Sequence, residues 1–284
     1  MKLHCRGLEL ELGKRTYIMG ILNVTPDSFS DGGKYNHLDA ALQHAQEMIE
    51  EGADILDIGG ESTRPWGHIQ ISEEEEIARV VPVIQALRKQ FPTILLSIDT
   101  YKWRVAEAAL KAGVHILNDI WGLQYDKGEM ANLAKEYEVP VIVMHNQNTE
   151  EYQEDRIQAL RKFFEKSFEI AEKANLSREC LILDPGLGFG KGFQGDVEIL
   201  GRLSELRDMG PILLGTSKKR FIGTLLEGLP SEERVEGTTA TTVIGIQQGV
   251  DIVRVHNVKE NKRVAMVADA IYRKDYVCDN ITYK

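Results

Sequence analysis

The chain has 284 residues, of which 43% are hydrophobic, and it carries a formal net charge of −10 at pH 7. This length and composition suffice for one large core, expected as a single domain over residues 1–284, and the acidic balance argues against a broad surface for nucleic acid or anionic membrane. The three cysteines, Cys5, Cys180 and Cys278, lie too far apart in the sequence for a disulfide framework or a cysteine zinc site, so we expect a cytoplasmic protein.

The N-terminal segment MKLHCRGLELELGK is polar and has no apolar region of the signal-peptide type. No later apolar run approaches the roughly 20 residues that a membrane-spanning helix needs. We therefore expect neither a signal peptide nor a membrane span. Residues 3–16 are predicted to form a short hairpin or cap around Gly13.

The first strongly apolar run covers residues 18–22 and predicts a strand that is buried on both faces. It ends at the polar residue Asn23, and a segment dense in Pro, Asp, Ser and Gly follows as far as Gly33. That composition is typical of a loop with specific turns. The same succession of apolar strand, polar end and loop recurs along the chain.

Eight short strands, rich in Ile, Leu and Val, are predicted to alternate with helices. The strands are expected at 18–22, 54–58, 94–99, 115–119, 140–144, 180–183, 211–214 and 251–255. The helices are expected at 36–52, after a Ser72 cap, and at 102–112, 130–137, 150–174, 196–209, 221–227, 234–249 and 259–273. The acidic run Glu73–Glu76 is interpreted as a solvated helix start.

Strands that are apolar on both faces are typical of a parallel sheet covered by helices. An open doubly wound sheet has the same alternation, but it usually lacks a functional residue at nearly every strand end. In an eight-stranded parallel barrel the strand ends converge on one face, over one cavity. The sequence therefore favours an α/β fold of the (β/α)8 TIM-barrel type, with the active site at the C-terminal ends of the strands.

Acids and amides follow the first six strands, and cations follow the last two. In chain order these residues are Asn23, Asp57 with Glu61, Asp99, Asn118, His145, Asp184, Lys219, and Arg254 with His256. Barrels commonly bind phosphate at the loops after strands seven and eight, where the cations lie. Two carboxylates and an amide on the opposite wall suit an amino-substituted heterocycle.

Several of these residues have a purely structural alternative. Asp99 could cap the following helix, Asn118 could bond loop backbone, and His145 could be a structural histidine at a strand end. Arg254 lies inside an apolar run, where a guanidinium needs a partner. The segment GLGFGKG has neither the spacing of a dinucleotide fingerprint nor the Ser or Thr of a P-loop.

Seven motifs together make the sequence resemble the dihydropteroate synthase family over almost its whole length. They are NVTPDSFSDGG at 23–33, DIGGESTRP at 57–65, SIDT at 97–100, NDIWG at 118–122, DPGLGFGK at 184–191, GTSKKRFIG at 215–223 and RVHN at 254–257. The resemblance implies a transferase of folate biosynthesis that joins 6-hydroxymethyl-7,8-dihydropterin diphosphate to 4-aminobenzoate, releasing diphosphate and 7,8-dihydropteroate. It further implies a requirement for Mg²⁺, a homodimer, and inhibition by sulfonamides.

The resemblance also implies roles for individual positions. The residues matched to the pterin pocket are Asp99, Asn118, Asp184 and Lys219, lined by Met144, Phe189 and Gly215. Those matched to the diphosphate and the metal are Asn23, Arg254 and His256, with Asn23 as the metal ligand. Those matched to the two loops of the aminobenzoate site are Phe29, Asp31, Thr63, Arg64 and Pro65.

The residue chemistry is consistent with this reaction. Mg²⁺ and Arg254 can stabilise the departing diphosphate, and Asp31 and Asp99 can stabilise the pterin methylene cation that forms. Together with Lys219, these side chains are the expected catalytic groups. No activated Ser or Cys stands out as a nucleophile, and none is needed.

Two positions depart from the family pattern. Trp66 intrudes into STRPG, which predicts a longer second loop and altered sulfonamide sensitivity, and Arg220 replaces a serine found in some members. Two other functions stay open: a methyltransferase that passes methyl from methyltetrahydrofolate to a corrinoid protein, and a non-catalytic pterin binder. The former would not need NVTPDSFSDGG or GGESTRP.

Overall fold

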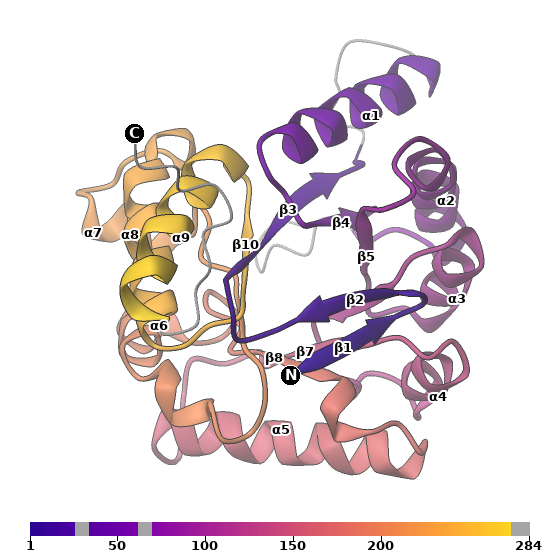
Figure 1. Cartoon of the computed structure of the whole chain (residues 1–284). Coiled ribbons are helices and arrows are strands. Elements are labelled where there is room, and N and C mark those ends of the chain that lie inside the picture. Colours follow the sequence, from indigo (N-terminus) through magenta and orange to yellow (C-terminus); the bar gives the residue numbers. More distant parts are fainter. Residues whose placement is uncertain (26–33, 62–69, 274–284) are drawn as a thin grey trace.

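The computed structural model describes residues 1–25, 34–61 and 70–273 (Figure 1). Eight parallel strands in this part of the chain form a barrel. They are β3 (Tyr17–Asn23), β4 (Ile55–Gly59), β5 (Leu95–Asp99), β6 (Ile116–Asp119), β7 (Val141–Met144), β8 (Leu181–Asp184), β9 (Leu213–Leu214) and β10 (Ile252–Val255). Apart from its shortened seventh strand, the sheet follows the eight predicted runs.

The strands hydrogen-bond in the order β8-β7-β6-β5-β4-β3-β10-β9. The ring closes between its two outer members, because Leu183 and Ile212 form a parallel bridge and the Leu183 N–H donates to the Pro211 carbonyl over 2.8 Å. The prediction of a (β/α)8 barrel is confirmed.

Helices surround the barrel in Figure 1 and cover the outward faces of its strands. They are α1 (Lys34–Glu50), α2 (Glu73–Gln90), α3 (Trp103–Ala112), α4 (Glu129–Glu136), α5 (Arg156–Lys173), α6 (Gly192–Gly201), α7 (Arg220–Leu225), α8 (Val235–Gln247) and α9 (Val258–Tyr272). Short 3-10 helices are η2 (Arg178–Cys180), η3 (Leu203–Leu206) and η4 (Ser231–Glu233). Within the described ranges, none of the helices combines the length and apolarity that crossing a bilayer requires.

Two helices, α5 and α6, differ most from their predicted bounds. α5 begins only at Arg156, because the Asp155 carboxylate accepts the N–H groups of Ile157 and Gln158 over 3.0 and 3.2 Å and caps the helix there. The helix expected at 196–209 instead begins at Gly192 and ends at Gly201, and η3 follows it.

An N-terminal hairpin lies across one end of the barrel (Figure 1) and consists of β1 (Lys2–Cys5) and β2 (Leu8–Glu11). Its turn is at Arg6 and Gly7, both with positive φ, rather than at Gly13 as expected. Its buried side chains pack on a layer of inward-pointing residues, one from each barrel strand. That layer is Met19, Ile55, Leu95, Ile116, Ile142, Ile182, Leu213 and Ile252.

Inward-pointing side chains change from apolar to polar between two successive layers along the barrel axis. Side chains alternate along a strand, so the residue two positions after each of these apolar residues points inward again, nearer the C-terminal end. In five strands that residue is polar. These five are Asp57, Ser97, Asn118, Asp184 and Arg254. An apolar floor thus lies beneath a polar layer, which places the site at the C-terminal ends of the strands.

Candidate active site at the C-terminal end of the barrel

Arg254 of β10 is the central cation of the polar layer. Its Nε donates to Asp57 Oδ2 over 2.6 Å, and its Nη2 donates to Asp99 Oδ2 over 2.7 Å. Asn118 Nδ2 donates to the same Asp57 oxygen over 2.9 Å. Residues from β10, β4, β5 and β6 therefore meet inside the barrel, and the guanidinium has the partners that its apolar strand demands.

This arrangement corrects one expectation from the sequence. Cations and acids were predicted on opposite walls, yet Arg254 is bonded directly to the acids of β4 and β5. Asp57 is also more central than predicted, because it is fully buried and bonds two of the site residues. The sequence feature that could have predicted this is a carboxylate in the middle of an apolar strand.

Burial dominates the electrostatics of this group. It raises the pKa of Asp99 to about 7, with Arg254 opposing the shift and Asp57 adding to it. Burial alone would lower the pKa of Arg254, but the carboxylates of Asp57 and Asp99 raise it above its usual value. The guanidinium therefore stays charged, and its charge opposes the effect of burial on the pKa of Asp99.

Three buried polar atoms in this layer have no hydrogen-bond partner among the described residues. They are Asp57 Oδ1, Asp99 Oδ1 and Ser97 Oγ. Leaving such atoms unpaired typically costs about 1–3 kcal/mol each. Unpaired carboxylate oxygens beside Arg254 are acceptors available to the N–H groups of a ligand.

Asp184 is the member of the polar layer on β8, and Lys219 at the start of α7 lies near it. A Cβ placed on Gly215 would lie 4.0 Å from both Asp184 Oδ2 and Lys219 Nζ, so the two groups converge over this glycine. Burial raises the pKa of Asp184, opposed by Lys219, and burial lowers the pKa of Lys219, opposed by Asp184. The result is a buried carboxylate near the amine of a half-buried lysine.

An apolar and aromatic group borders these charges. Met144 at the end of β7 is buried with Tyr101 and Ile120, and Phe189 packs against them. The Lys219 Nζ lies 4.9 Å from the centroid of the Phe189 ring and donates to the Leu187 carbonyl. A flat ring could be held here by an aromatic face on one side and polar atoms at its edge.

The remaining predicted residues lie on neighbouring strand ends. Asn23 ends β3 and is half-buried, and a Cβ on Gly59 would lie 3.5 Å from its Oδ1 and 3.9 Å from Asp99 Oδ2. His256 follows β10, and its Nδ1 lies 2.9 Å from Ser217 Oγ. The predicted residues Phe29, Asp31, Thr63, Arg64, Pro65 and Trp66 lie outside the described residues.

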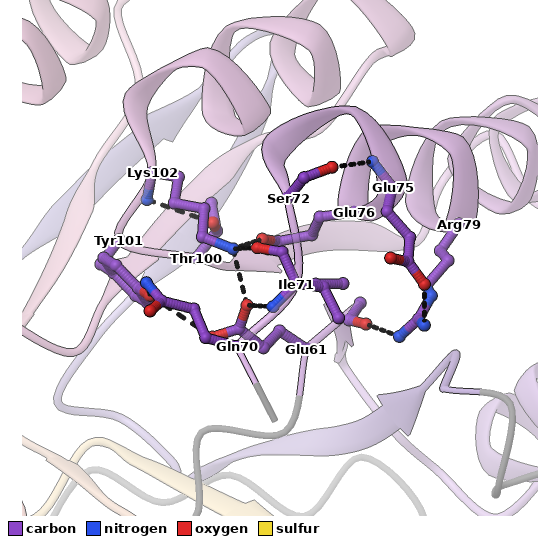
Figure 2. A network of polar contacts seen from close by, with 11 residues as sticks. Glu61, Gln70, Ile71, Ser72, Glu75, Glu76, Arg79, Thr100, Tyr101 and Lys102 are labelled. Carbon is purple, nitrogen blue, oxygen red and sulfur yellow. Dashed lines mark hydrogen bonds and ion pairs between the residues drawn. The ribbon is translucent and has the colours of Figure 1, made fainter. Parts of the chain in front are cut away.

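Glu61 belongs to a second polar group beside the site (Figure 2). The Lys102 Nζ donates to Glu61 Oε2 over 2.6 Å, to Glu76 Oε2 over 2.8 Å and to the Ile71 carbonyl over 2.8 Å. Glu61 also accepts the Ile71 N–H over 3.1 Å. Glu61, after β4, and Ile71, before α2, are thereby joined.

Glu76 contradicts the prediction of a solvated acidic run, since it is only 1% exposed. Glu73, Glu74 and Glu75 are half-buried or exposed as expected for a helix start, but the fourth acid of the run turns inward to Lys102. Helical periodicity could have suggested this, because Glu76 shares a face with the buried Val80 and Val83.

A (β/α)8 barrel with acids, an amide and cations gathered over an apolar floor defines an enzyme that binds a polar heterocycle, and the comparisons agree. The family described as pterin binding enzyme matches residues 19–256. A dihydropteroate synthase of Clostridium beijerinckii is 52% identical over 268 residues, covering 94% of this chain and 98% of that protein.

Two solved structures extend the comparison. The crystal structure of dihydropteroate synthase from Clostridium difficile in the presence of pteroic acid has 54% identity and a TM-score of 0.90, covering 93% of this chain and all of that one. The enzyme of Xanthomonas albilineans in complex with 7,8-dihydropteroate has 38% identity and a TM-score of 0.86, covering 95% and 98%. The chain therefore belongs to the dihydropteroate synthases of the pterin binding enzyme family.

Proposed function

We propose that this transferase joins 6-hydroxymethyl-7,8-dihydropterin diphosphate to 4-aminobenzoate, with the pterin read by the polar layer of the barrel. The observation that carries the assignment is the pair of unpaired carboxylate oxygens, Asp57 Oδ1 and Asp99 Oδ1, beside Asn118. The amino and ring N–H groups of a pterin are the donors that such oxygens lack. A bound pterin would relieve the cost of leaving them unpaired.

The reaction needs separation of charge rather than a protein nucleophile. The bond from the pterin methylene carbon to the diphosphate oxygen breaks, and the electron pair leaves with the diphosphate. The aryl amine nitrogen then forms the new C–N bond and releases one proton to solvent or to the diphosphate. Arg254 can balance the leaving charge, and Asp99 can stabilise the cationic pterin.

Magnesium is the proposed cofactor. Asn23 Oδ1 is a hard oxygen donor near Asp99, which suits Mg²⁺, although the described residues contain no cluster of three or more His, Cys, Asp or Glu able to hold a metal. Mg²⁺ commonly takes one or two protein ligands and completes its shell with water and substrate phosphate. When bound, it would supply Lewis-acid stabilisation of the diphosphate oxygens.

The roles of the other predicted residues complete the proposal. Asp184, Lys219 and Gly215 would bind the pterin edge opposite Asp57, with Met144 and Phe189 against its face. His256 would face the diphosphate together with Arg254. Asp31, Thr63 and Arg64 would complete the aminobenzoate site from the two loops that contain them.

The test is to mix the purified protein with both substrates and Mg²⁺ and to measure diphosphate and dihydropteroate in parallel. Equal amounts of both products are expected, with loss of activity on chelation of the metal. Asp99→Asn should lower kcat by about a hundredfold or more. Glu9→Gln, on the hairpin at the opposite end of the barrel, is the matched control. Absence of diphosphate release, or methyl transfer from methyltetrahydrofolate, would refute the proposal.

A homodimer through α8 and α9 is also proposed. Ile244 of α8 and four residues of α9 expose large apolar side chains on neighbouring helices. The α9 residues are Met266, Val267, Ile271 and Tyr272. Exposed apolar groups gathered in this way commonly mark protein interfaces. Analytical ultracentrifugation should find a dimer that Ile271→Glu converts to monomer, whereas Tyr125→Glu, at the exposed ring that packs against Tyr101 and Trp121, leaves it intact.

The proposed compartment is the cytoplasm. Cys5 and Cys180 are both free thiols, which suits a reducing environment.

A further inference from the structure

The segment between β8 and α6 contains a buried lysine to which the proposed chemistry gives no role. Lys191 is only 1% exposed. Its Nζ lies 2.7 Å from His145 Nδ1, 3.0 Å from the His145 carbonyl oxygen and 2.8 Å from the Phe189 carbonyl oxygen. Within the described residues, Lys191 forms no ion pair with a carboxylate.

Such a site is rare because a buried ammonium without a counter-ion is costly. Here the three acceptors match the three N–H donors of a lysine ammonium. Burial, with Lys191 adding to the effect, lowers the pKa of His145 to about 2, so the imidazole is neutral. His145 Nδ1 can then accept from the ammonium while the ring proton resides on Nε2.

These contacts join the segment after β8 to the end of β7. Gly186 and Gly190 both have positive φ, and a Cβ on either would overlap the carbonyl oxygen of His145 or Gln147. The Gln147 Nε2 also donates to the Gly190 carbonyl over 2.8 Å. The two backbones thus lie against each other with no room for a side chain at the two glycines.

The segment carries two groups that face Lys219 of the pterin site. The Leu187 carbonyl accepts a hydrogen bond from Lys219 Nζ, and the Phe189 ring lies 4.9 Å from the same nitrogen. Lys191 bonds the carbonyl of Phe189 itself. A shift of the Phe189 carbonyl is therefore expected to move the Phe189 ring, and with it the surface against which Lys219 Nζ lies.

We propose that Lys191 is a positioning residue for the pterin substrate, which acts by holding Phe189 against the end of β7 through His145. It does not contact the reacting atoms. The identity of the substrate rests on the proposed function. Aminobenzoate binding should change less than pterin binding, because the Lys191 contacts bear on Phe189, whose ring lies against Lys219 of the pterin site.

Lys191→Met is the decisive variant, since methionine fills similar volume without hydrogen-bond donors. Calorimetry with 6-hydroxymethyl-7,8-dihydropterin diphosphate and Mg²⁺ should show a dissociation constant raised about tenfold or more. The KM for that substrate should rise alongside, and the KM for aminobenzoate should stay within about twofold. Lys162→Met, at an exposed lysine of α5 that pairs with Glu154, is the matched control and should change none of these three constants.

Variants of His145 provide an independent test if Lys191→Met does not fold. His145→Gln keeps an acceptor for Lys191 and should retain most pterin affinity, whereas His145→Leu should weaken it as Lys191→Met does. A folded Lys191→Met or His145→Leu with unchanged pterin affinity would overturn the inference. Wild-type protein that fails to bind the pterin diphosphate at all would instead overturn the proposed function together with it.

Discussion

Two buried lysines beside the barrel mouth, Lys102 and Lys191, have different kinds of hydrogen-bond partner for the buried ammonium group. Lys102 is 7% exposed and bonds two carboxylates, Glu61 and Glu76. Lys191 is 1% exposed and bonds two carbonyl oxygens and a neutral imidazole. Each joins backbone segments that are distant in sequence.

The difference appears in the protonation equilibria. Burial alone would lower the pKa of Lys102, but hydrogen bonds to Glu61 and Glu76 raise it above its usual value. For Lys191, burial lowers the pKa to about 7, and the charges of Asp196 and Asp184 oppose this only in part. A lysine bonded to carboxylates thus holds its proton more strongly than a more deeply buried lysine bonded to neutral acceptors.

The Lys102 group as a whole carries excess negative charge, since one ammonium faces two carboxylates. Burial raises the pKa of Glu76, with Lys102 opposing the shift. Removing the ammonium would leave both acids buried without a counter-ion. Removing the Lys191 amine would leave only neutral acceptors unpaired. The two lysines should therefore differ sharply in what their loss costs.

The largest expected effect is that of Lys102→Met. It should lower the free energy of unfolding at pH 7 by about 3–5 kcal/mol, because Glu61 and Glu76 lose their shared cation. Urea unfolding followed by circular dichroism measures this. Lys111→Met, which removes an exposed partner of Glu107 on α3, should change stability by less than about 0.5 kcal/mol. A loss below about 1 kcal/mol for Lys102→Met would show that the acids do not need the ammonium.

A smaller effect for each unit of pH is expected in the pH dependence of the two lysines. The unfolded chain holds the Lys191 proton up to the ordinary lysine pKa of 10.5, whereas the folded chain releases it at a pKa of about 7. Between these values the unfolded state binds more protons, so the stability of wild type relative to Lys191→Met should rise with pH, by at most about 1.4 kcal/mol per unit.

Lys102 should behave differently over the same range. Its pKa in the folded state is raised above 10.5, so folded and unfolded chains both hold the proton from about pH 7 to 10. Stability relative to Lys102→Met should then be flat, and should fall only as the pH passes above 10.5. Unfolding titrations of both variants and wild type measure the two slopes. Equal slopes of relative stability against pH for the two variants would contradict the proposed difference between the pKa values of Lys102 and Lys191.

The smallest effect is expected from Tyr101→Phe. The Tyr101 hydroxyl accepts from Gln70 Nε2 over 2.9 Å and donates weakly to Glu61 Oε1 over 3.4 Å. Its loss should cost about 0.5–1 kcal/mol, because Lys102 still pairs with Glu61. Tyr125→Phe, at the exposed ring that packs edge-on against Tyr101, is the control and should be neutral. If Tyr101→Phe lowered the free energy of unfolding as much as Lys102→Met, the hydroxyl and not the ammonium would be the main partner of Glu61.

The barrel and most of its chemistry follow from the order of residues along the chain. Apolar runs of strand length alternating with amphipathic helices predict parallel strands, and a polar residue at each strand end predicts the face on which the site lies. Asp99, Asn118, Asp184 and Arg254 were all found in this way. Local patterns suffice here because the direction of a side chain follows from its position in the strand.

Which polar groups contact one another is known only from the folded chain. Asp57 and Arg254 are 197 residues apart and bond inside the barrel. Glu76 has the sequence surroundings of a solvated helix start, yet it is buried because Lys102 packs over it. Lys191 looked like part of a glycine-rich loop, but β7 presents His145 to it. The free-energy cost of burying a charge depends on its partners. These come from segments distant in the sequence, so a local pattern does not predict them.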